Sequence, residues 1–394
     1  MTSRQRILSA VSCGPVDHVP LYLRFWPMGG KDTIPFDWKD QVHRAEYLLF
    51  RGLDDTLLLQ PPLGYIEDYR AELLPSVTAT VRLEPAAAGE YPVLHKEYRT
   101  AAGVLRHSVR KTDDWIHGND VYLFSDYNVS RATRHAVQTE EDLGVLPYVL
   151  AEPSAEQVEA FAAEADRLRR HSRRLGVALD GGWVALGDAA VMLCGMERVL
   201  LAQMEEPEFL RRLMDILLTW ELRRVERLLE QGVDMIVHMA WYEGTDFWTP
   251  DNWRRFVRPG LSRLVERAHA AGAKYRYIIT KGLAPLLADI RDAGVDCVMG
   301  VDPVQDRLDL AAVKEQSAGR LCLMGGVNSP IMLSQWTEAE IDAAVSTAVR
   351  VLGRNGGFIL YPVDAVFSDV AWDRVEQLIR CWERHRDRFD GKRP

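Results

Sequence analysis

From residue 153 onward, short apolar segments alternate strictly with amphipathic segments of helical periodicity. Apolar runs of about four to eight residues are typical of strands that are buried on both faces. Strands separated by helices pair in parallel, with right-handed crossovers. Candidate strands lie near residues 20, 57, 177, 235, 276, 298, 322 and 359. This number favours an α/β fold of the closed (β/α)8 TIM barrel type, with an open doubly wound sheet as the alternative.

Residues 64–150 have a different pattern from the rest of the chain. The segments 78–83, 94–99 and 105–111 alternate apolar and polar residues, and residues 101–103 supply a turn between the last two. This is the pattern of a half-exposed antiparallel hairpin. We therefore predict a single domain spanning 1–394, with an inserted β-rich segment at 64–150 that covers the active-site face of the barrel.

Charge and apolar content exclude several classes of function. The 394 residues include 48 Lys and Arg against 57 Asp and Glu, so the chain has no global attraction to nucleic acid or anionic lipid. The arginines of 167–174 recur at helical spacing among acids, which indicates a solvated helix face. No apolar run approaches the roughly 20 residues of a membrane span. Five scattered cysteines without a CxxC pair predict no disulfide framework, and the expected location is cytoplasmic.

Polar residues directly after strands are the first candidates for chemistry, because the C-terminal strand ends form the catalytic face of such a barrel. His238 ends the fifth strand, where it could be a metal ligand, a general acid–base or a support for a rim loop. Glu243 and Asp364 could complete a mixed nitrogen–oxygen site that suits zinc without thiolate. Asp246 is interpreted as a cap of the helix that begins near Thr249.

Two cations and two tyrosines also follow strands. Lys281 could bind a substrate carboxylate or phosphate, or be a solvated loop residue. Arg24 could grip a carboxylate with two hydrogen bonds, or form a structural ion pair. Tyr277 and Tyr361 could donate hydrogen bonds to an oxygen in the pocket, or simply pack against it.

Tryptophans are frequent at the predicted strand ends. Several on one rim would line an aromatic cavity, although core packing explains any one of them. The catalytic candidates are therefore His238, Glu243, Lys281 and Asp364. The substrate-binding candidates are Arg24, Trp26, Gln60, Trp183, Trp241, Tyr242, Tyr277, Asn328 and Tyr361.

Several segments, taken in order, resemble the uroporphyrinogen decarboxylase superfamily. They comprise Arg6-Ile-Leu-Ser-Ala10, residues 15–20, residues 194–200, Gly232-Val-Asp-Met-Ile-Val-His238, residues 249–259 and Leu323-Met-Gly-Gly-Val-Asn328. The resemblance covers the first sixty residues and nearly everything after 180. It implies a TIM barrel, and a reaction among those of the decarboxylase proper and of corrinoid- or thiol-linked methyltransferases.

Departures from the family pattern narrow the expected reaction. Family members that activate a thiol hold zinc on a His-x-Cys after the sixth strand and a later cysteine. The matching positions here are Ile278 and Thr280, then Asp364, so that type of zinc site is not expected. The decarboxylase proper uses arginines after strand one and an aspartate after strand two. Here Arg24 stands alone and Gln60 replaces the carboxylate, which disfavours uroporphyrinogen as substrate.

The resemblance and its departures predict a methyltransferase-type enzyme that demethylates a small aromatic methyl donor. His238, Glu243 and Asp364 would polarise the donor oxygen, directly or through zinc. The methyl group would pass to a corrinoid on a separate partner protein, because no cobalamin-binding segment is visible. One alternative is a non-redox lyase or decarboxylase, in which Arg24 and Lys281 clamp a small carboxylated substrate. Another is a catalytically silent binding protein, and a homodimer is left open.

Overall fold

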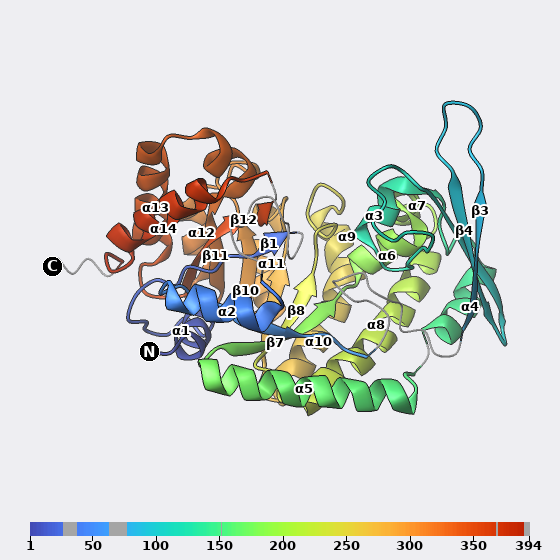
Figure 1. The fold of residues 1–394 in the computed structure, drawn as a ribbon, viewed down its shortest axis with the longest axis horizontal. Coiled ribbons are helices and arrows are strands. Elements are labelled where there is room, and N and C mark those ends of the chain that lie inside the picture. The colour runs from blue at the N-terminus through green and yellow to red at the C-terminus, as the bar shows by residue number, and fades with distance from the viewer. Residues whose placement is uncertain (27–37, 63–76, 151, 368, 390–394) are drawn as a thin grey trace.

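The computed structural model describes residues 1–26, 38–62, 77–150, 152–367 and 369–389. Its centre is a curled parallel sheet of seven strands in the order β12-β11-β10-β9-β8-β7-β2 (Figure 1). The strands are β2 (Thr56–Leu59), β7 (Ala178–Val184), β8 (Met235–Met239), β9 (Lys274–Ile278), β10 (Cys297–Val301), β11 (Cys322–Asn328) and β12 (Phe358–Val363). Nearly all of their residues are buried, as expected for a parallel sheet that helices cover.

Helices follow the strands and surround the sheet (Figure 1). The longer ones are α1 (Ser3–Val11), α2 (Gln41–Phe50), α4 (Glu140–Val149), α5 (Ala155–Leu175), α6 (Gly187–Cys194), α8 (Pro207–Glu230), α10 (Arg258–Ala270), α12 (Leu310–Ser317), α13 (Glu338–Leu352) and α14 (Trp372–His385). The shorter ones are α3 (Asp126–Arg131), α7 (Met196–Ala202), α9 (Pro250–Asn252), the π-helix η1 (Trp253–Val257), the 3-10 helix η2 (Ala284–Leu286), α11 (Leu287–Asp292) and the π-helix η3 (Ser329–Leu333). Within the described ranges, none of these helices combines the length and apolar character needed to cross a membrane.

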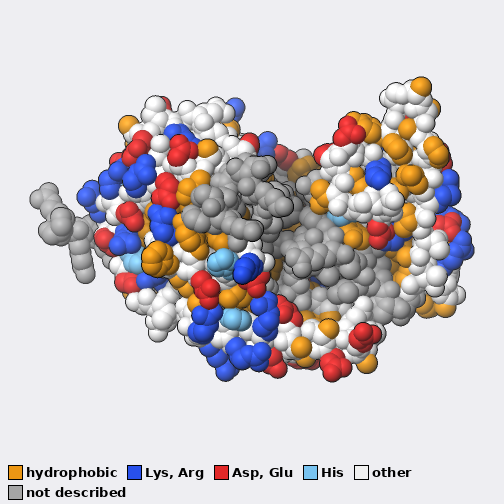
Figure 2. All heavy atoms as spheres, in the orientation of Figure 1, with side chains coloured by type: hydrophobic (Ala, Val, Ile, Leu, Met, Phe, Trp, Pro, Cys, Tyr) orange, Lys and Arg blue, Asp and Glu red, His pale blue; other side chains and the backbone are white. Residues whose placement is uncertain are grey.

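Local sequence signals explain the ends of α5. Ser154 and Gln157 form a reciprocal capping box at its start, and Gly176 ends it in the left-handed conformation. Three arginines along its outer face, Arg167, Arg169 and Arg174, pair with acids, so the predicted solvated helix face is confirmed. Figure 2 shows basic and acidic side chains interspersed over this side of the molecule.

The segment predicted as the first strand is less regular than the others. The Tyr22 amide donates to the Leu360 carbonyl at 3.0 Å, and the Asp54 amide donates to the Leu21 carbonyl at 3.2 Å. These isolated bridges join the segment to both edges of the sheet. The next residues form the two-residue strand β1 (Phe25–Trp26), which pairs in parallel with β13 (Val366–Phe367). A continuous strand over 19–25 is therefore not observed, and Pro20 has no N–H to contribute to one.

A separate antiparallel sheet has the order β3-β4-β5-β6 and confirms the antiparallel strands predicted between 78 and 111. Its strands are β3 (Thr78–Glu84), β4 (Val93–Thr100), β5 (Gly103–Arg110) and β6 (Ala132–Arg134). It packs on α4, which in turn contacts α8, and it lies at the far right of the molecule in Figure 1. That it covers the active-site face stays a prediction.

His107 in β5 makes this sheet sensitive to acid. It is fully buried, and its ring nitrogens have no hydrogen-bond partner among the described residues. Burial, reinforced by His135 and Lys96, lowers the pKa of His107 to about 3. Between about pH 6.5 and about pH 3, the imidazole of His107 is therefore protonated in the unfolded chain but neutral in the folded chain.

Wild-type stability should fall as the pH drops through this window, with a contribution from His107 of up to ~1.4 kcal/mol per pH unit. His107→Leu should remove that contribution, because leucine binds no proton. Urea unfolding of both proteins at neutral and mildly acidic pH measures the difference. Parallel pH curves for the two proteins would contradict this account.

Candidate active site

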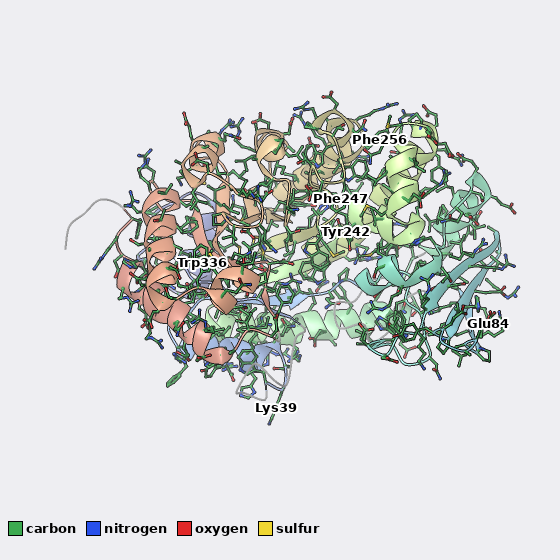
Figure 3. All side chains as sticks on the ribbon, turned by 90° about the horizontal axis from the view of Figure 1, so that it is seen from above. Lys39, Glu84, Tyr242, Phe247, Phe256 and Trp336 are labelled. Atoms are coloured by element: carbon green, nitrogen blue, oxygen red, sulfur yellow. The ribbon has the colours of Figure 1, made fainter. Side chains whose placement is uncertain are left out.

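A pocket of about 280 Å³ lies at the C-terminal ends of β8, β9 and β12. Its walls consist of Arg24, Trp241, Tyr242, Asp246, Phe247, Thr280, Lys281, Asp364, Ala365 and Phe367. Five of the predicted site residues are therefore in one place: Arg24, Trp241, Tyr242, Lys281 and Asp364. Figure 3 looks down on this end, with Tyr242 and Phe247 close together near the middle and Glu84 of β3 at the far edge. Among the described residues that line the pocket, none comes from the antiparallel sheet.

Arg24 is held between two indole rings. Its guanidinium carbon lies 5.0 Å from the ring centre of Trp183 and 5.4 Å from that of Trp241. One of its nitrogens is 3.9 Å from a carboxylate oxygen of Asp364. Stacking on aromatic faces favours a weakly hydrated guanidinium over an ammonium. The predicted strand-end cation is therefore present, and it has a fixed orientation.

The aromatic loop that follows β8 is anchored by a residue outside the predicted site. The buried carboxylate of Asp188, in the first turn of α6, accepts hydrogen bonds from the amides of Trp241 (3.0 Å) and Tyr242 (2.9 Å). The Trp248 ring N–H donates to the Tyr242 carbonyl at 2.7 Å. Both ends of the short loop are thus fixed. A carboxylate directly after Gly187, the first residue of α6, is the sequence signal that could have revealed this anchor.

Two loops interlock on one wall of the pocket. A Cβ atom on Gly244 would lie 1.8 Å from the Lys281 carbonyl oxygen, so only glycine allows this approach. The ammonium of Lys281 pairs with Asp246 at 3.1 Å, and both side chains are substantially exposed. The predicted capping role of Asp246 is wrong, because the Thr249 hydroxyl caps α9 by accepting from the Asn252 amide.

His238 and Glu243 belong to a buried network behind the pocket. The His238 Nδ1 atom lies 2.7 Å from the Tyr275 hydroxyl, and its Nε2 atom lies 3.3 Å from Glu243. Glu243 also accepts hydrogen bonds from the Gly187 amide at 2.5 Å and from the Tyr277 hydroxyl. Burial, helped by the Glu243 charge, raises the pKa of Tyr277 well above its usual value, so this tyrosine remains a donor.

The direction in which the side chains of β8 and β9 point explains why His238 and Tyr277 lie behind the pocket. Val237 and Arg276 line a cavity inside the curled sheet, and side chains alternate between the two faces of a strand. His238 and Tyr277, one position further along, therefore point to the helix-covered side. Both His238 and Glu243 have no exposed surface.

The described residues do not fit the predicted zinc site. Both ring nitrogens of His238 have hydrogen-bond partners, whereas Asp364 lies beside Arg24 on the pocket side. Over the described ranges, no three His, Cys, Asp or Glu side chains are placed to hold a metal ion together. The structure thus fails to unite His238, Glu243 and Asp364 as ligands.

Asn328 and Tyr361 lie outside the pocket walls. Asn328 is fully buried, its amide donates to Asp302 at 2.7 Å, and its oxygen accepts from the Ile331 amide at the start of η3. Its polar atoms therefore serve the fold. Tyr361 is buried near Asp364 and Arg24. Burial first, and then the Asp364 charge, raise the pKa of Tyr361 well above its usual value.

The remaining predicted residues fall in three places. Trp183 is buried, with its ring 6.2 Å from that of Trp241, and supports Arg24 from below the pocket. Gln60 is half-buried just after β2 and is not among the residues that line the pocket. Trp26 takes part in β1 through its backbone, and its side chain lies outside what the structure describes.

A small polar cavity inside the sheet was not predicted from the sequence. It measures about 40 Å³ and shares Arg24 with the pocket. Asp180 accepts from Arg276 at 2.5 Å and from the Thr56 hydroxyl at 2.8 Å, and both charged groups are buried. An arginine in the middle of an apolar strand was the signal, because an arginine is rarely buried without a partner.

Comparisons with known proteins agree with this architecture. The family model described as uroporphyrinogen decarboxylase (URO-D) matches residues 124–385. A methyltransferase from Methanosarcina mazei superposes with a TM-score of 0.59 at 17% identity, covering 98% of this chain and 99% of its own.

A D-psicose 3-epimerase from Clostridium cellulolyticum H10 gives a TM-score of 0.35 at 13% identity, with 63% of this chain and 87% of its own covered. No curated protein matches the chain. At 17% identity, the methyltransferase from Methanosarcina mazei shows a similarity of fold alone.

Proposed function

The chain belongs to the uroporphyrinogen decarboxylase (URO-D) family, and from that membership we propose that it is a methyltransferase-type enzyme acting on a small aromatic methyl donor. The observation that carries the proposal is the convergence of Arg24, Asp364 and Lys281 with four aromatic side chains in one pocket. Its volume of about 280 Å³ matches a ligand of one substituted ring. The similarity in fold to a methyltransferase supports the same reaction class.

We also propose that the sheet closes as a (β/α)8 barrel. The segment 20–22 makes backbone hydrogen bonds to Leu360 beside it on one edge and to Asp54 on the other. It thus occupies the position of an eighth strand between β12 and β2. Closure explains why Arg24, at the end of this segment, can share a pocket with residues that follow β8 and β9.

The pocket residues can supply what demethylation of an aryl ether requires. A nucleophile attacks the methyl carbon, the carbon–oxygen bond breaks, and its electron pair remains on the ring oxygen. That oxygen leaves only if positive charge or a proton stabilises it. Arg24, aligned by Asp364, and Lys281 provide positive charge there. Trp241 and Tyr242 offer faces on which the ring can stack.

His238 and Glu243 act as positioning residues in this proposal. Both side chains are fully buried and do not reach the pocket. In this proposal Arg24, rather than His238, therefore polarises the donor oxygen. Glu243 joins the amide of Gly187 to the hydroxyl of Tyr277, and it immediately follows the pocket aromatics. The network therefore fixes the position of the loop that carries Trp241 and Tyr242.

The proposed methyl acceptor is a corrinoid on a partner protein. When bound, a corrinoid supplies a strongly nucleophilic cobalt that accepts methyl groups. The macrocycle is far larger than a pocket of about 280 Å³, so the partner would present it at the open mouth. The residues of this chain would bind the donor, exclude water and stabilise the leaving oxygen.

A second candidate is a carboxy-lyase on a small carboxylated substrate. The observation that favours it is the presence of Arg24 and Lys281 in one pocket, because two cations can clamp a carboxylate. Loss of carbon dioxide would leave an electron pair on carbon, and a pocket acid would protonate it.

Asp364→Asn tests the leading proposal. The asparagine side chain carries no negative charge, so it can no longer align the guanidinium of Arg24. We therefore expect kcat/KM for methyl transfer from aryl methyl ethers to free reduced cobalamin to fall roughly 100-fold. The formation of methylcobalamin, followed by its absorbance, measures the rate. Glu84→Gln in β3 makes the same change of charge at the far edge and should leave the rate unchanged.

The same assay separates the alternatives. An unaltered rate in Asp364→Asn would contradict the role of the Arg24–Asp364 pair. Carbon dioxide release from methoxybenzoates without methyl transfer would favour the lyase. Ligand binding by calorimetry without any turnover would indicate the catalytically silent binding protein.

A further inference from the structure

A second pocket, of about 300 Å³, opens on the flank of the molecule between α8 and the stretch formed by η1 and α10. We call it the flank pocket. It is lined by Leu186, Arg211, Met214, Asp215, Leu218, Arg255, Phe256, Pro259, Gly260 and Arg263. None of these residues lines the strand-end pocket. In Figure 3, Phe256 lies farther from the middle than Phe247 and Tyr242.

The chemistry of the flank pocket is two-sided. Its floor is apolar, with buried side chains of Leu186, Leu218 and Phe256. A Cβ atom on Gly260 would lie 2.9 Å from a Leu186 methyl group, so α10 approaches this floor closely because position 260 has no side chain.

The rim of the flank pocket is basic. It carries three arginines against the single carboxylate of Asp215. Arg211 pairs with Glu208. Arg255 and Arg263 form no ion pair with any residue in the described part of the chain, although the Arg255 guanidinium stacks on Phe256 at 4.8 Å. An apolar floor below unpaired guanidinium groups is complementary to a ligand with a hydrocarbon body and an anionic head.

Both walls of the flank pocket connect to Glu243. On one side, Leu186 precedes Gly187, whose amide donates to the Glu243 carboxylate at 2.5 Å. On the other, Phe256 belongs to η1, whose first residue Trp253 donates to the Tyr277 hydroxyl at 3.4 Å.

Tyr277 in turn donates to Glu243. The flank pocket therefore shares a hydrogen-bonded support with the loop that carries Trp241 and Tyr242. Single-turn π-helices such as η1 are frequent at functional sites.

We propose that the flank pocket is a regulatory site for a small amphipathic anion, such as a medium-chain carboxylate, and that its occupant stabilises the loop 240–247. The carboxylate would pair with Arg255 and Arg263 while the chain lies on Leu186, Leu218 and Phe256. Its volume is at the lower end of ordinary small-molecule sites, which suits a chain of about eight carbons. The proposal does not depend on the reaction at the strand ends.

Calorimetric titration with octanoate tests the binding step. Octanoate should bind the wild-type protein, and Arg255→Gln with Arg263→Gln should weaken it at least about tenfold, since each charge-assisted hydrogen bond to an anion is strong. The matched control is Arg170→Gln with Arg173→Gln. These exposed arginines on α5 also form no ion pair with described residues.

The control pair should bind octanoate as the wild type does. Octan-1-ol keeps the hydrocarbon chain but lacks the carboxylate, and acetate keeps the carboxylate but lacks the chain. Both should bind much more weakly than octanoate. Equal octanoate affinity in the two double variants, or no octanoate binding at all, would overturn the proposal.

Hydrogen exchange tests the coupling to the loop. Saturating octanoate should slow amide exchange in 240–247 several-fold in the wild type but not in the Arg255/Arg263 double variant. Exchange in β3, at the far edge, should not change and serves as the internal reference. Arg-dependent octanoate binding with unchanged exchange in 240–247 would overturn the regulatory role.

Discussion

Arg224→Met should lower the free energy of unfolding by about 3–5 kcal/mol, because it leaves the carboxylate of Glu221 buried without its counter-charge. Arg224 contacts both carboxylate oxygens of Glu221, at 2.7 and 2.8 Å, and each side chain is 1% exposed. Glu221 also accepts from the Ala185 amide at 3.0 Å, next to the floor of the flank pocket. Urea unfolding at neutral pH measures the loss.

The sign of the pH dependence gives an independent check. Burial raises the pKa of Glu221, and Arg224 opposes that shift. Without Arg224 the folded-state pKa should rise further above the unfolded value. A raised carboxyl pKa favours the folded state below the unfolded pKa, and this advantage is lost as the pH rises through the folded pKa. The deficit of Arg224→Met should therefore shrink as the pH falls.

The double variant Glu221→Gln with Arg224→Met separates charge from packing. Removing both charges should recover most of the stability at neutral pH, because no unpaired charge remains buried. A single Arg224→Met variant within about 0.5 kcal/mol of the wild type would contradict the interpretation, since surface substitutions have effects of that size.

Gly244→Ala should cost about 3 kcal/mol or more of stability and most of the activity, because the new methyl group would clash with the backbone of the opposite loop. Its Cβ atom would lie 1.8 Å from the Lys281 carbonyl oxygen, and that atom cannot rotate away as a side chain could. Relief would need separation of the loops that carry Tyr242 and Lys281. Thermal and urea unfolding, together with the cobalamin assay, measure both effects.

Gly144→Ala is the matched control for that experiment. Gly144 is exposed inside α4, and a Cβ atom at this position would have no neighbour within 4 Å. Alanine should therefore stabilise the protein by about 0.5–1 kcal/mol through helix propensity and leave activity unchanged. Equal effects of the two glycine substitutions would show that the close approach at Gly244 is not restrictive.

Much of the fold could be predicted from apolar periodicity. Seven of the eight expected strands form one parallel sheet, because runs such as 235–239 can be buried only between layers of helices. The segment near residue 20 has the same composition but forms only bridges and a two-residue strand. Composition does not reveal how many backbone hydrogen bonds a segment makes once it contains Pro20.

The site was partly predictable for a similar reason. The rule that chemistry follows parallel strands predicted Arg24, Trp241 and Asp364 as site residues, and all three line the strand-end pocket. It could not predict that His238 and Glu243 face the helices, because a change of one residue in strand phase reverses the face of every side chain. Which side chains of β9 face the interior of the sheet becomes clear only from the position of Arg276 in the structure. The zinc hypothesis depended on the opposite phase.

Asp188 has a consequence for how related sequences should be compared. Its carboxylate replaces the regular sheet partners that the amides of Trp241 and Tyr242 lack. In an alignment, position 188 should therefore covary with the length of the segment after β8. Two relatives could share every side chain that faces the ligand and still differ in specificity if one of them had lost this distant carboxylate.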